Sequence, residues 1–284
     1  MLSSEFSRLG IRSSAPQKIA SNKFRCRLSY AKIMNLSEQI VLFFASFLAN
    51  WFSALSGGGA GLIQFPMLIF LGLPFGVALA THKVASVALG LGATMRHWKE
   101  STLERRFSLI ILGSGLPGVV LGAMTILSIP SHYAQMALGA LTMGLGIYSV
   151  FKPKLGIEHT PKNRNGRGLA GGMIGLFIVG FLNGSITSGT GLFLTMWLIH
   201  HFGLDYKRAV AYTLVLCGLF WNGTGALVLG MIGQIAWSWM PALLLGSLIG
   251  GYIGSHYAIK KGNKLIKRSF EIITILIGLK LLLG

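Results

Sequence analysis

The sequence predicts an all-α polytopic membrane protein made of two inverted repeats, each a broken or re-entrant helix pair followed by three transmembrane helices. Three observations predict this fold. Apolar residues fill 52% of the 284 positions and charged residues only 11%, whereas a soluble domain has about 25% charged residues. Several apolar runs approach the roughly 20 residues that a helix needs to cross a bilayer. A glycine-rich break interrupts these runs twice, at corresponding places in two halves of the chain.

The apolar runs follow one another along most of the chain. The alternative, buried helices of a large soluble protein, would need a hydrated surface that so few charged residues cannot supply. The runs cover residues 40–55, 77–95, 107–127, 133–151, 209–229, 235–259 and 266–283.

The formal net charge of +18 would suit a nucleic-acid-binding protein, but the distribution of basic residues does not. Almost no Lys or Arg lies inside the apolar runs. They gather beside them, around residues 96–106, 152–167 and 260–268, as the positive-inside rule expects for cytoplasmic loops. We therefore expect a lipid bilayer around the chain and no nucleic-acid partner. The two cysteines, Cys26 and Cys217, form neither a disulfide framework nor a metal site.

Four segments divide the chain. Residues 1–33 form a basic, serine-rich tail, which is typical of an organellar transit peptide or of a start assigned upstream of Met34, and the second interpretation is preferred. Residues 34–151 and 168–284 are the two membrane repeats. Residues 152–167 are a polar, basic linker between them.

The two breaks have the same surroundings. The first covers residues 56–61 (SGGGAG) and the second residues 183–191 (NGSITSGTG). Each is followed by a short apolar arm, then Gly-Leu, then a helix that opens Ala-x-Ala, at residues 78–80 and 209–211. A membrane chain that breaks its helices at matching places in two halves usually builds its substrate site there.

Charge predicts the relative orientation of the halves. In the first half the loop at 96–106 is basic and the next loop, at 128–132, is neutral. In the second half the equivalent loops reverse this order, because 230–236 is neutral and 258–268 is basic. Equivalent loops on opposite sides of the membrane mean that the halves are inverted.

Inversion requires an odd number of crossings in each half. Three long helices follow each break, so we expect the broken pair to be a re-entrant hairpin without a net crossing. The arms at 62–71 and 192–202 are too short to span at about 1.5 Å per residue, whereas 40–55 is nearly long enough. We expect six spans and two re-entrant hairpins, with the linker in the cytoplasm and the N-terminus outside. In the alternative topology the first arm crosses and the tail stays inside.

The breaks are candidate anion sites. Glycine lets the backbone turn sharply, and the helix that starts near residues 59–61 or 189–191 presents N–H groups and a partial positive charge. The alternative role for glycine is close helix packing. It suits residues 113–122 and 246–254 better than a triple glycine before a short arm.

Lys83 lies about two turns into the helix after the first hairpin. A cation within a membrane segment usually has a function, and together with a helix N-terminus it favours an anionic substrate. The alternative is a lysine that snorkels to the interface. The expected substrate-binding residues are Ser56, Gly57, Gly58, Gly59, Gly61, Thr81, Lys83, Asn183, Ser188, Gly189, Thr190, Thr213 and Asn222.

We expect no catalytic residue, metal or cofactor. A membrane-embedded enzyme would need a nucleophile–base pair or metal ligands at membrane depth, and the histidines instead lie near the ends of apolar segments. Glu271 follows Lys267 by four residues and Arg268 by three, so it can pair with either. Asn222 lies within an apolar run and can bind either a substrate oxygen or a neighbouring helix.

A family resemblance rests on the motifs Leu55-Ser56-Gly57-Gly58-Gly59-Ala60-Gly61-Leu62, Phe65-Pro66, Gly72-Leu73-Pro74, Ala80-Thr81-His82-Lys83, Arg96-His97, Gly189-Thr190-Gly191, Ala209-Val210-Ala211 and 246–254. With them the chain resembles the TauE/SafE sulfite exporter family, also called the 4-toluene sulfonate uptake permease family, over nearly everything after Met34. Two departures lie in the second half, where the break keeps fewer glycines and Asp205 stands where the first half has Pro74.

The resemblance implies a multi-pass permease that moves sulfite, sulfonates or related small organic anions, with the breaks near the substrate. We therefore expect a secondary permease in the cell (inner) membrane that works by alternating access of inverted repeats. A passive anion channel and a permease for small carboxylates are the alternatives. The sequence leaves open the exact substrate, the direction, the coupling ion and whether the chain forms a homodimer.

Overall fold

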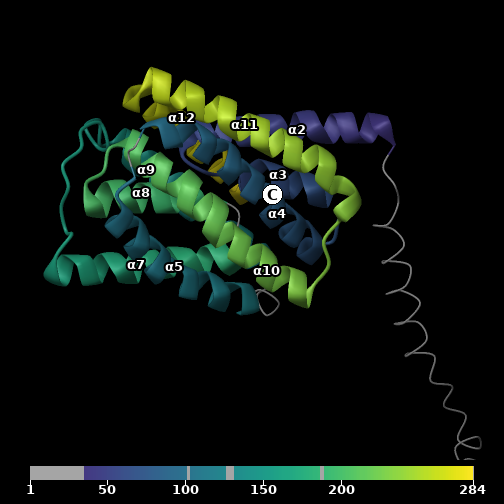
Figure 1. Cartoon of the computed structure of the whole chain (residues 1–284), viewed down its shortest axis with the longest axis horizontal. Helices are drawn as coiled ribbons and strands as arrows, with labels where there is room; N and C mark the ends of the chain where they lie inside the picture. Colours follow the sequence, from purple (N-terminus) through teal and green to yellow (C-terminus); the bar gives the residue numbers. More distant parts are fainter. Residues whose placement is uncertain (1–34, 101–102, 126–130, 186–188, 284) are drawn as a thin grey trace, which may run out of the picture.

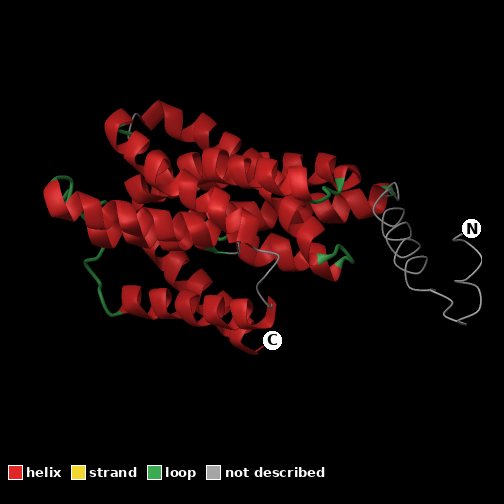
Figure 2. Cartoon of the chain, turned by 90° about the horizontal axis from the view of Figure 1, so that it is seen from below, coloured by secondary structure: helices red, strands yellow, loops and turns green. Residues whose placement is uncertain are grey.

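The computed structural model describes residues 35–100, 103–125, 131–185 and 189–283, with the side chains of 131–138, 141, 281 and 283 left aside. All regular elements in these ranges are helices (Figure 2). In chain order they are α2 (Leu36–Ser56), α3 (Ala60–Phe70), α4 (Phe75–His97), η2 (Trp98–Glu100), α5 (Arg105–Thr125), α6 (Ser131–Val150), α7 (Gly166–Ser185), α8 (Thr190–Phe202), α9 (Tyr206–Tyr212), η4 (Thr213–Trp221), α10 (Asn222–Ile232), η5 (Trp237–Trp239), α11 (Met240–Lys261) and α12 (Asn263–Leu283).

Within the described ranges, six helical segments are long and apolar enough to cross a membrane: α2, α4 with η2, α5, α7, the continuous α9–α10 unit and α11 with η5. Their outer faces expose large apolar side chains, for example Phe44 on α2, Leu109 on α5 and Leu227 on α10. In water such surfaces would be costly, but hydrocarbon solvates them. The all-α polytopic membrane fold expected from the sequence is therefore confirmed.

Four of these segments, α4, α5, α9–α10 and α11, are expected spans, and the other two are not. The six segments include the first arm of each broken pair, α2 with 21 residues and α7 with 20, and they omit α6 and α12. The last helix of the chain carries five charged residues, Lys264, Lys267, Arg268, Glu271 and Lys280, and α6 is interspersed with polar residues, so both fall short in apolar character rather than in length.

The first arms are longer than expected because they start outside the apolar runs. Asn35 caps α2 in a capping box, in which its Oδ1 accepts from the Glu38 amide at 2.9 Å and its own amide donates to Glu38 Oε2 at 3.0 Å. At its other end Gly57 adopts φ +84° and ends the helix. The equivalent arm α7 starts at Gly166, inside the segment expected to be linker.

Each broken pair starts and ends at the same end of the bundle. Gln39 near the start of α2 donates to the Ser238 carbonyl at 2.7 Å, and Leu68 near the end of α3 packs in the same cluster as Ala236 and Trp239. The pair α2–α3 therefore forms a hairpin that opens at the loop before α11.

The other pair opens at the opposite end. His201 near the end of α8 lies 2.9 Å from the Gly168 carbonyl near the start of α7, and the adjoining linker accepts a hydrogen bond from Asn263 at the Ile157 carbonyl, 2.8 Å away. Asn263 follows the C-terminal end of α11, whereas Ser238 precedes its start. The two hairpins thus enter the bundle from opposite ends of α11.

Small residues bring the long helices together. A Cβ on Gly246, Gly250 or Gly254 of α11 would lie 2.5–2.6 Å from a backbone oxygen of α2, and Gly180 and Gly184 of α7 approach the backbone of α5 in the same way. Figure 1 shows α2 with α11 along one side of the bundle and α7 with α5 along the other. The packing role expected for glycines in 246–254 is borne out by these contacts.

Candidate functional site

The tips of the two hairpins lie in direct backbone contact. A Cβ on Gly58 would lie 2.6 Å from the Gly191 carbonyl carbon and 2.7 Å from its Cα. Gly57, Gly58, Gly59 and Gly189 all adopt positive φ, between +76° and +127°, a region that residues with a Cβ rarely occupy. Glycine is therefore required here twice, for the turn and for the close approach.

Both short helices begin at this contact. Gly59 is the N-cap of α3 and Gly189 that of α8, and neither cap supplies a side-chain hydrogen bond. The first turn of a helix has N–H groups without helical acceptors and carries a partial positive charge. Two such ends, from helices of 11 and 13 residues, therefore face the same small region.

A cavity of about 40 Å³ occupies that region. A water molecule requires roughly 10–15 Å³ on this scale, so the cavity holds a few waters or one small ion. Both hairpins line it, together with α2, α4, α7, η4 and the start of α10. The lining residues are Ser53, Gly58, Gly59, Ala60, Gly61, His82, Ser86, Leu89, Asn183, Gly189, Thr190, Gly191, Thr213, Leu214, Cys217, Gly218 and Asn222.

Lys83 lies directly behind this cavity. It is fully buried, and its Nζ donates to Asn183 O at 2.6 Å, Asn183 Oδ1 at 2.8 Å and Asn222 Oδ1 at 3.2 Å. In the described part of the chain no carboxylate pairs with it. Lys83 therefore does not snorkel to an interface. It places an ammonium group behind two asparagines that face the cavity.

Asn183 links the charge to the second break. Its Nδ2 donates to Thr190 Oγ1 at 2.9 Å and lies 3.3 Å from Asn222 Oδ1. Because Nδ2 is a donor, both asparagines present their oxygens to Lys83. The end of α7, the start of α8 and α10 are thereby held to α4.

The turn of the first break is braced from the second half. Thr195 Oγ1 donates to the Gly57 carbonyl at 2.5 Å and lies 2.9 Å from Thr213 Oγ1. Ser56 Oγ donates to the Gly58 carbonyl at 2.8 Å. These contacts fix the geometry of Gly57 and Gly58.

The structure brings most of the expected substrate-binding residues together. Eight of them line the cavity: Gly58, Gly59, Gly61, Asn183, Gly189, Thr190, Thr213 and Asn222. Ser56, Gly57 and Lys83 lie beside it without lining it. Thr81 stands apart, because its Oγ1 accepts from the Ala236 amide at 3.0 Å in the loop before α11. Ser188 lies outside the described residues.

Two features of the site were not expected. The segment η4 is π-helical, and at its centre Gly218 meets Gly90 of α4, where an added Cβ would lie 2.9 Å from the Gly90 Cα. Such wide turns are frequent at functional sites. This one directs Thr213 and Cys217, four residues apart, toward the cavity.

The second feature is a buried polar chain that starts at the cavity wall. His82 Nε2 lies 3.2 Å from Ser86 Oγ, and His82 Nδ1 lies 2.7 Å from Gln64 Oε1. Gln64 Nε2 donates to Ser46 Oγ at 2.8 Å, and Ser46 Oγ lies 3.1 Å from Ser247 Oγ. His82 and Gln64 are 18 residues apart in sequence, and the packing of α3 against α4 brings them together.

The amino-acid sequence is similar to those of known membrane proteins over most of its length. The family model described as "Sulfite exporter TauE/SafE" matches residues 42–281. A "Probable membrane transporter protein" of Haemophilus influenzae is 29% identical over 242 residues, which cover 85% of this chain and 93% of that protein. The "Probable membrane transporter protein YfcA" of Escherichia coli strain K12 is 27% identical over 85% of this chain and 88% of its own. YunE of Bacillus subtilis, also a "Probable membrane transporter protein", is 26% identical over 86% and 97%. No solved structure matches significantly.

Proposed function

The chain belongs to the TauE/SafE sulfite exporter family and is a membrane transporter, and on that premise we propose that it is a secondary permease for a small oxyanion, with sulfite or an organosulfonate as the substrate class. The substrate occupies the cavity between the hairpin tips. The single observation that carries this proposal is the meeting of two helix N-termini at one cavity, with the Lys83 ammonium, which no described carboxylate neutralises, behind it.

The electrostatics of the cavity favour negative charge. Two helix N-termini each contribute about half a positive charge, and a buried ammonium adds a full one. In a low-dielectric site these charges act strongly. A substrate anion supplies the negative charge that the described surroundings of Lys83 lack. A cation would face three positive features at once.

The donors of the cavity match an oxyanion. The N-terminal ends of α3 and α8 face the cavity from two directions, and Asn183 and Asn222 hold the Lys83 ammonium behind its wall. A volume of about 40 Å³ admits a compact group such as sulfite or the head of a sulfonate. The organic part of a sulfonate would have to extend along a path that opens during transport.

The arrangement of the hairpins supports alternating access as the mechanism. They open at opposite ends of α11 and touch through Gly58 and Gly191, as two inverted repeats, residues 34–151 and 168–284, would place them. α2 of the first half packs on α11 of the second, and α7 of the second packs on α5 of the first. Rocking of one repeat against the other opens the cavity first to one side of the cell (inner) membrane and then to the other.

Transport by purified protein in proteoliposomes tests this function. We expect uptake of radiolabelled sulfite that is accelerated by unlabelled sulfite on the other side, because a carrier exchanges substrate and a channel does not. Lys83→Ala should reduce the rate of uptake at least about tenfold, which corresponds to a loss of ~1.4 kcal/mol in substrate binding energy or an equal rise in the transport barrier. Lys99→Ala, which removes an exposed lysine, should retain wild-type uptake.

Three results would change the conclusion. Full uptake of every tested anion by Lys83→Ala would remove the cation from the site. Uptake without exchange would make the protein a channel, and preference for acetate or formate over sulfite would make it a carboxylate permease. Because Lys83→Ala can lose its fold, its size-exclusion profile is recorded, and Lys83→Met, which keeps the volume of the side chain, is measured beside it.

A further inference from the structure

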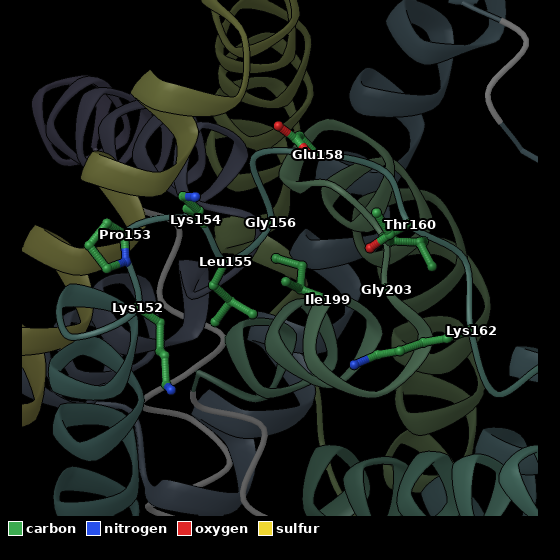
Figure 3. A pocket seen from close by; sticks show the side chains of 11 residues that line it. Lys152, Pro153, Lys154, Leu155, Gly156, Glu158, Thr160, Lys162, Ile199 and Gly203 are labelled. Atoms are coloured by element: carbon green, nitrogen blue, oxygen red, sulfur yellow. The ribbon is translucent and has the colours of Figure 1, made fainter.

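A second and larger cavity lies between the linker and the C-terminal end of α8. Its volume is about 570 Å³, far above that of the central cavity. Figure 3 shows the side chains that line it, which come from the linker on one side and from α8 and the loop after it on the other. The lining residues are Lys152, Pro153, Lys154, Leu155, Gly156, Glu158, Thr160, Lys162, Ile199, Gly203 and Leu204.

Backbone hydrogen bonds hold the linker over this cavity. The Thr160 amide donates to the Gly203 carbonyl at 2.9 Å, and the Lys162 amide donates to the Phe202 carbonyl at 3.0 Å. The Tyr206 amide donates to the Gly156 carbonyl at 2.8 Å. The linker is thus fixed at both ends of the cavity, and the cavity is a formed feature of the fold rather than a gap beside a loose loop.

The cavity collects lysines that have no acidic partner. Lys152, Lys154 and Lys162 make no ion pair among the described residues, and Glu158 is the one acid in the lining. In Figure 3 the ammonium groups of Lys152 and Lys162 lie toward one end of the view and the Glu158 carboxylate toward the other. All three lysines are exposed, and several positive charges around one concave surface attract anions.

Basic residues just outside the cavity are already paired. Arg164 Nη1 lies 2.6 Å from Glu104 Oε2. Lys267 Nζ lies 2.9 Å from Glu271 Oε1, one of the two pairings that the sequence allowed, and also donates to the Lys152 carbonyl at 3.0 Å. Two of the basic residues that adjoin the cavity are thus neutralised by an acid, whereas the three lysines that line it make no described ion pair.

The floor and the position of the cavity suit an amphiphilic anion. Leu155, Ile199 and Leu204 make the floor apolar. The cavity begins where α6 ends, directly after the exposed apolar side chains of Val150 and Phe151. Where exposed apolar side chains at a helix end are followed by lysines, the chain usually lies at the level of the phospholipid headgroups.

We propose that this cavity is a binding site for a phosphate-type oxyanion, held by Lys152, Lys154 and Lys162 above the apolar floor. The shared chemistry is a tetrahedral oxyanion with more than one charged oxygen, supplied by an anionic phospholipid headgroup or by a soluble phosphate. Basic clusters next to membrane spans commonly bind such headgroups.

The site is connected to the central cavity by α8. Ile199 and Gly203 border the linker cavity, and Thr190 at the other end of the same 13-residue helix borders the central one. A helix of this length spans about 20 Å as a rigid rod. The same helix therefore contributes residues to both sites.

Binding is measured on the full chain in an uncharged detergent, by thermal stability and by titration with two probes. The probes are inorganic phosphate and dioctanoyl phosphatidic acid, with dioctanoyl phosphatidylcholine as the neutral control. The test variant is Lys152→Gln/Lys154→Gln/Lys162→Gln. The matched control is Lys260→Gln/Lys261→Gln/Lys264→Gln, which removes three exposed lysines elsewhere in the chain.

The expected result is stabilisation by at least one anionic probe, with affinity reduced at least about tenfold in the test variant and unchanged in the control variant. Stabilisation by both probes identifies a general phosphate site, and stabilisation by phosphatidic acid alone identifies a lipid site. Equal binding by wild type and test variant, or equal stabilisation by phosphatidylcholine, would overturn the proposal. Lys83→Ala should retain this binding, so the result is independent of the central site.

Discussion

The contact between the hairpin tips makes a sharp prediction for Gly58→Ala. A Cβ at this position would lie 2.6 Å from the Gly191 carbonyl carbon, and real Cβ contacts stay above 3.0 Å. The two backbones must therefore separate. Residue 58 also has φ +127°, which costs a residue with a Cβ about 1–3 kcal/mol. Overpacking adds about 1–3 kcal/mol, so we expect a total destabilisation of roughly 2–6 kcal/mol and a displaced α3 N-terminus.

Three glycine variants separate the two causes. Gly72→Ala has φ +99° without any atom within 4 Å of the new Cβ, so it carries the strain alone. Gly76→Ala has neither strain nor contact. Gly191→Ala approaches the Gly58 Cα at 3.0 Å without positive φ, so it carries a milder contact alone.

Thermal stability in detergent and sulfite counterflow in proteoliposomes measure these variants. Gly76→Ala should match wild type in both assays, and Gly72→Ala should lose stability but retain transport. Gly58→Ala should lose transport even where it remains folded, because the anion donors have moved, and Gly191→Ala should lie between them. Wild-type transport by Gly58→Ala would refute the argument that this contact forms the substrate site.

Three further predictions concern packing, charge and access. Gly250→Leu should overpack the α2–α11 contact, reduce the free energy of unfolding by about 1–3 kcal/mol or more, and so lower the melting temperature. Gly113→Leu, whose Cβ meets nothing within 4 Å, should leave the melting temperature unchanged. Asn183→Leu should reduce sulfite uptake and destabilise the fold by about 1–3 kcal/mol, because it removes an acceptor from a buried ammonium; a variant with wild-type uptake and melting temperature would contradict this. In a Cys26→Ser background, sulfoacetate should slow the reaction of Cys217 with N-ethylmaleimide, as measured by mass spectrometry, and an unchanged rate would place the substrate elsewhere.

The sequence predicted the parts of the site that depend on glycine. Three consecutive glycines in an apolar run have few explanations other than a sharp turn, and the structure has Gly57, Gly58 and Gly59 at positive φ. The sequence also placed the Lys83 cation within a membrane segment, and its side chain is fully buried; its role in substrate binding stays a prediction.

Contacts between the halves could not be read from the sequence. Nothing in the run around Asn183 indicates that it will bind Lys83, a residue 100 positions away. The bond from His82 to Gln64 depends in the same way on the angle between α3 and α4. A motif is local, whereas these bonds arise from how separate helices pack.

Helix lengths were misjudged for a related reason. The polar start of α2 after Asn35 and the start of α7 at Gly166 lie before the expected segments, so hydropathy alone placed the starts of both arms too late. The π-helical turn of η4 has no local signal at all, because Thr213–Trp221 is as apolar as an ordinary membrane helix.

The most direct measurement is an experimental structure of the protein with selenite, an analogue of sulfite whose selenium gives an anomalous signal. We expect a selenium peak between the start of α3 and the start of α8, within hydrogen-bonding distance of the backbone amides of Gly59, Ala60, Gly189 and Gly191. A selenium peak elsewhere, with the space between Gly58 and Gly191 unoccupied at saturating selenite, would contradict it.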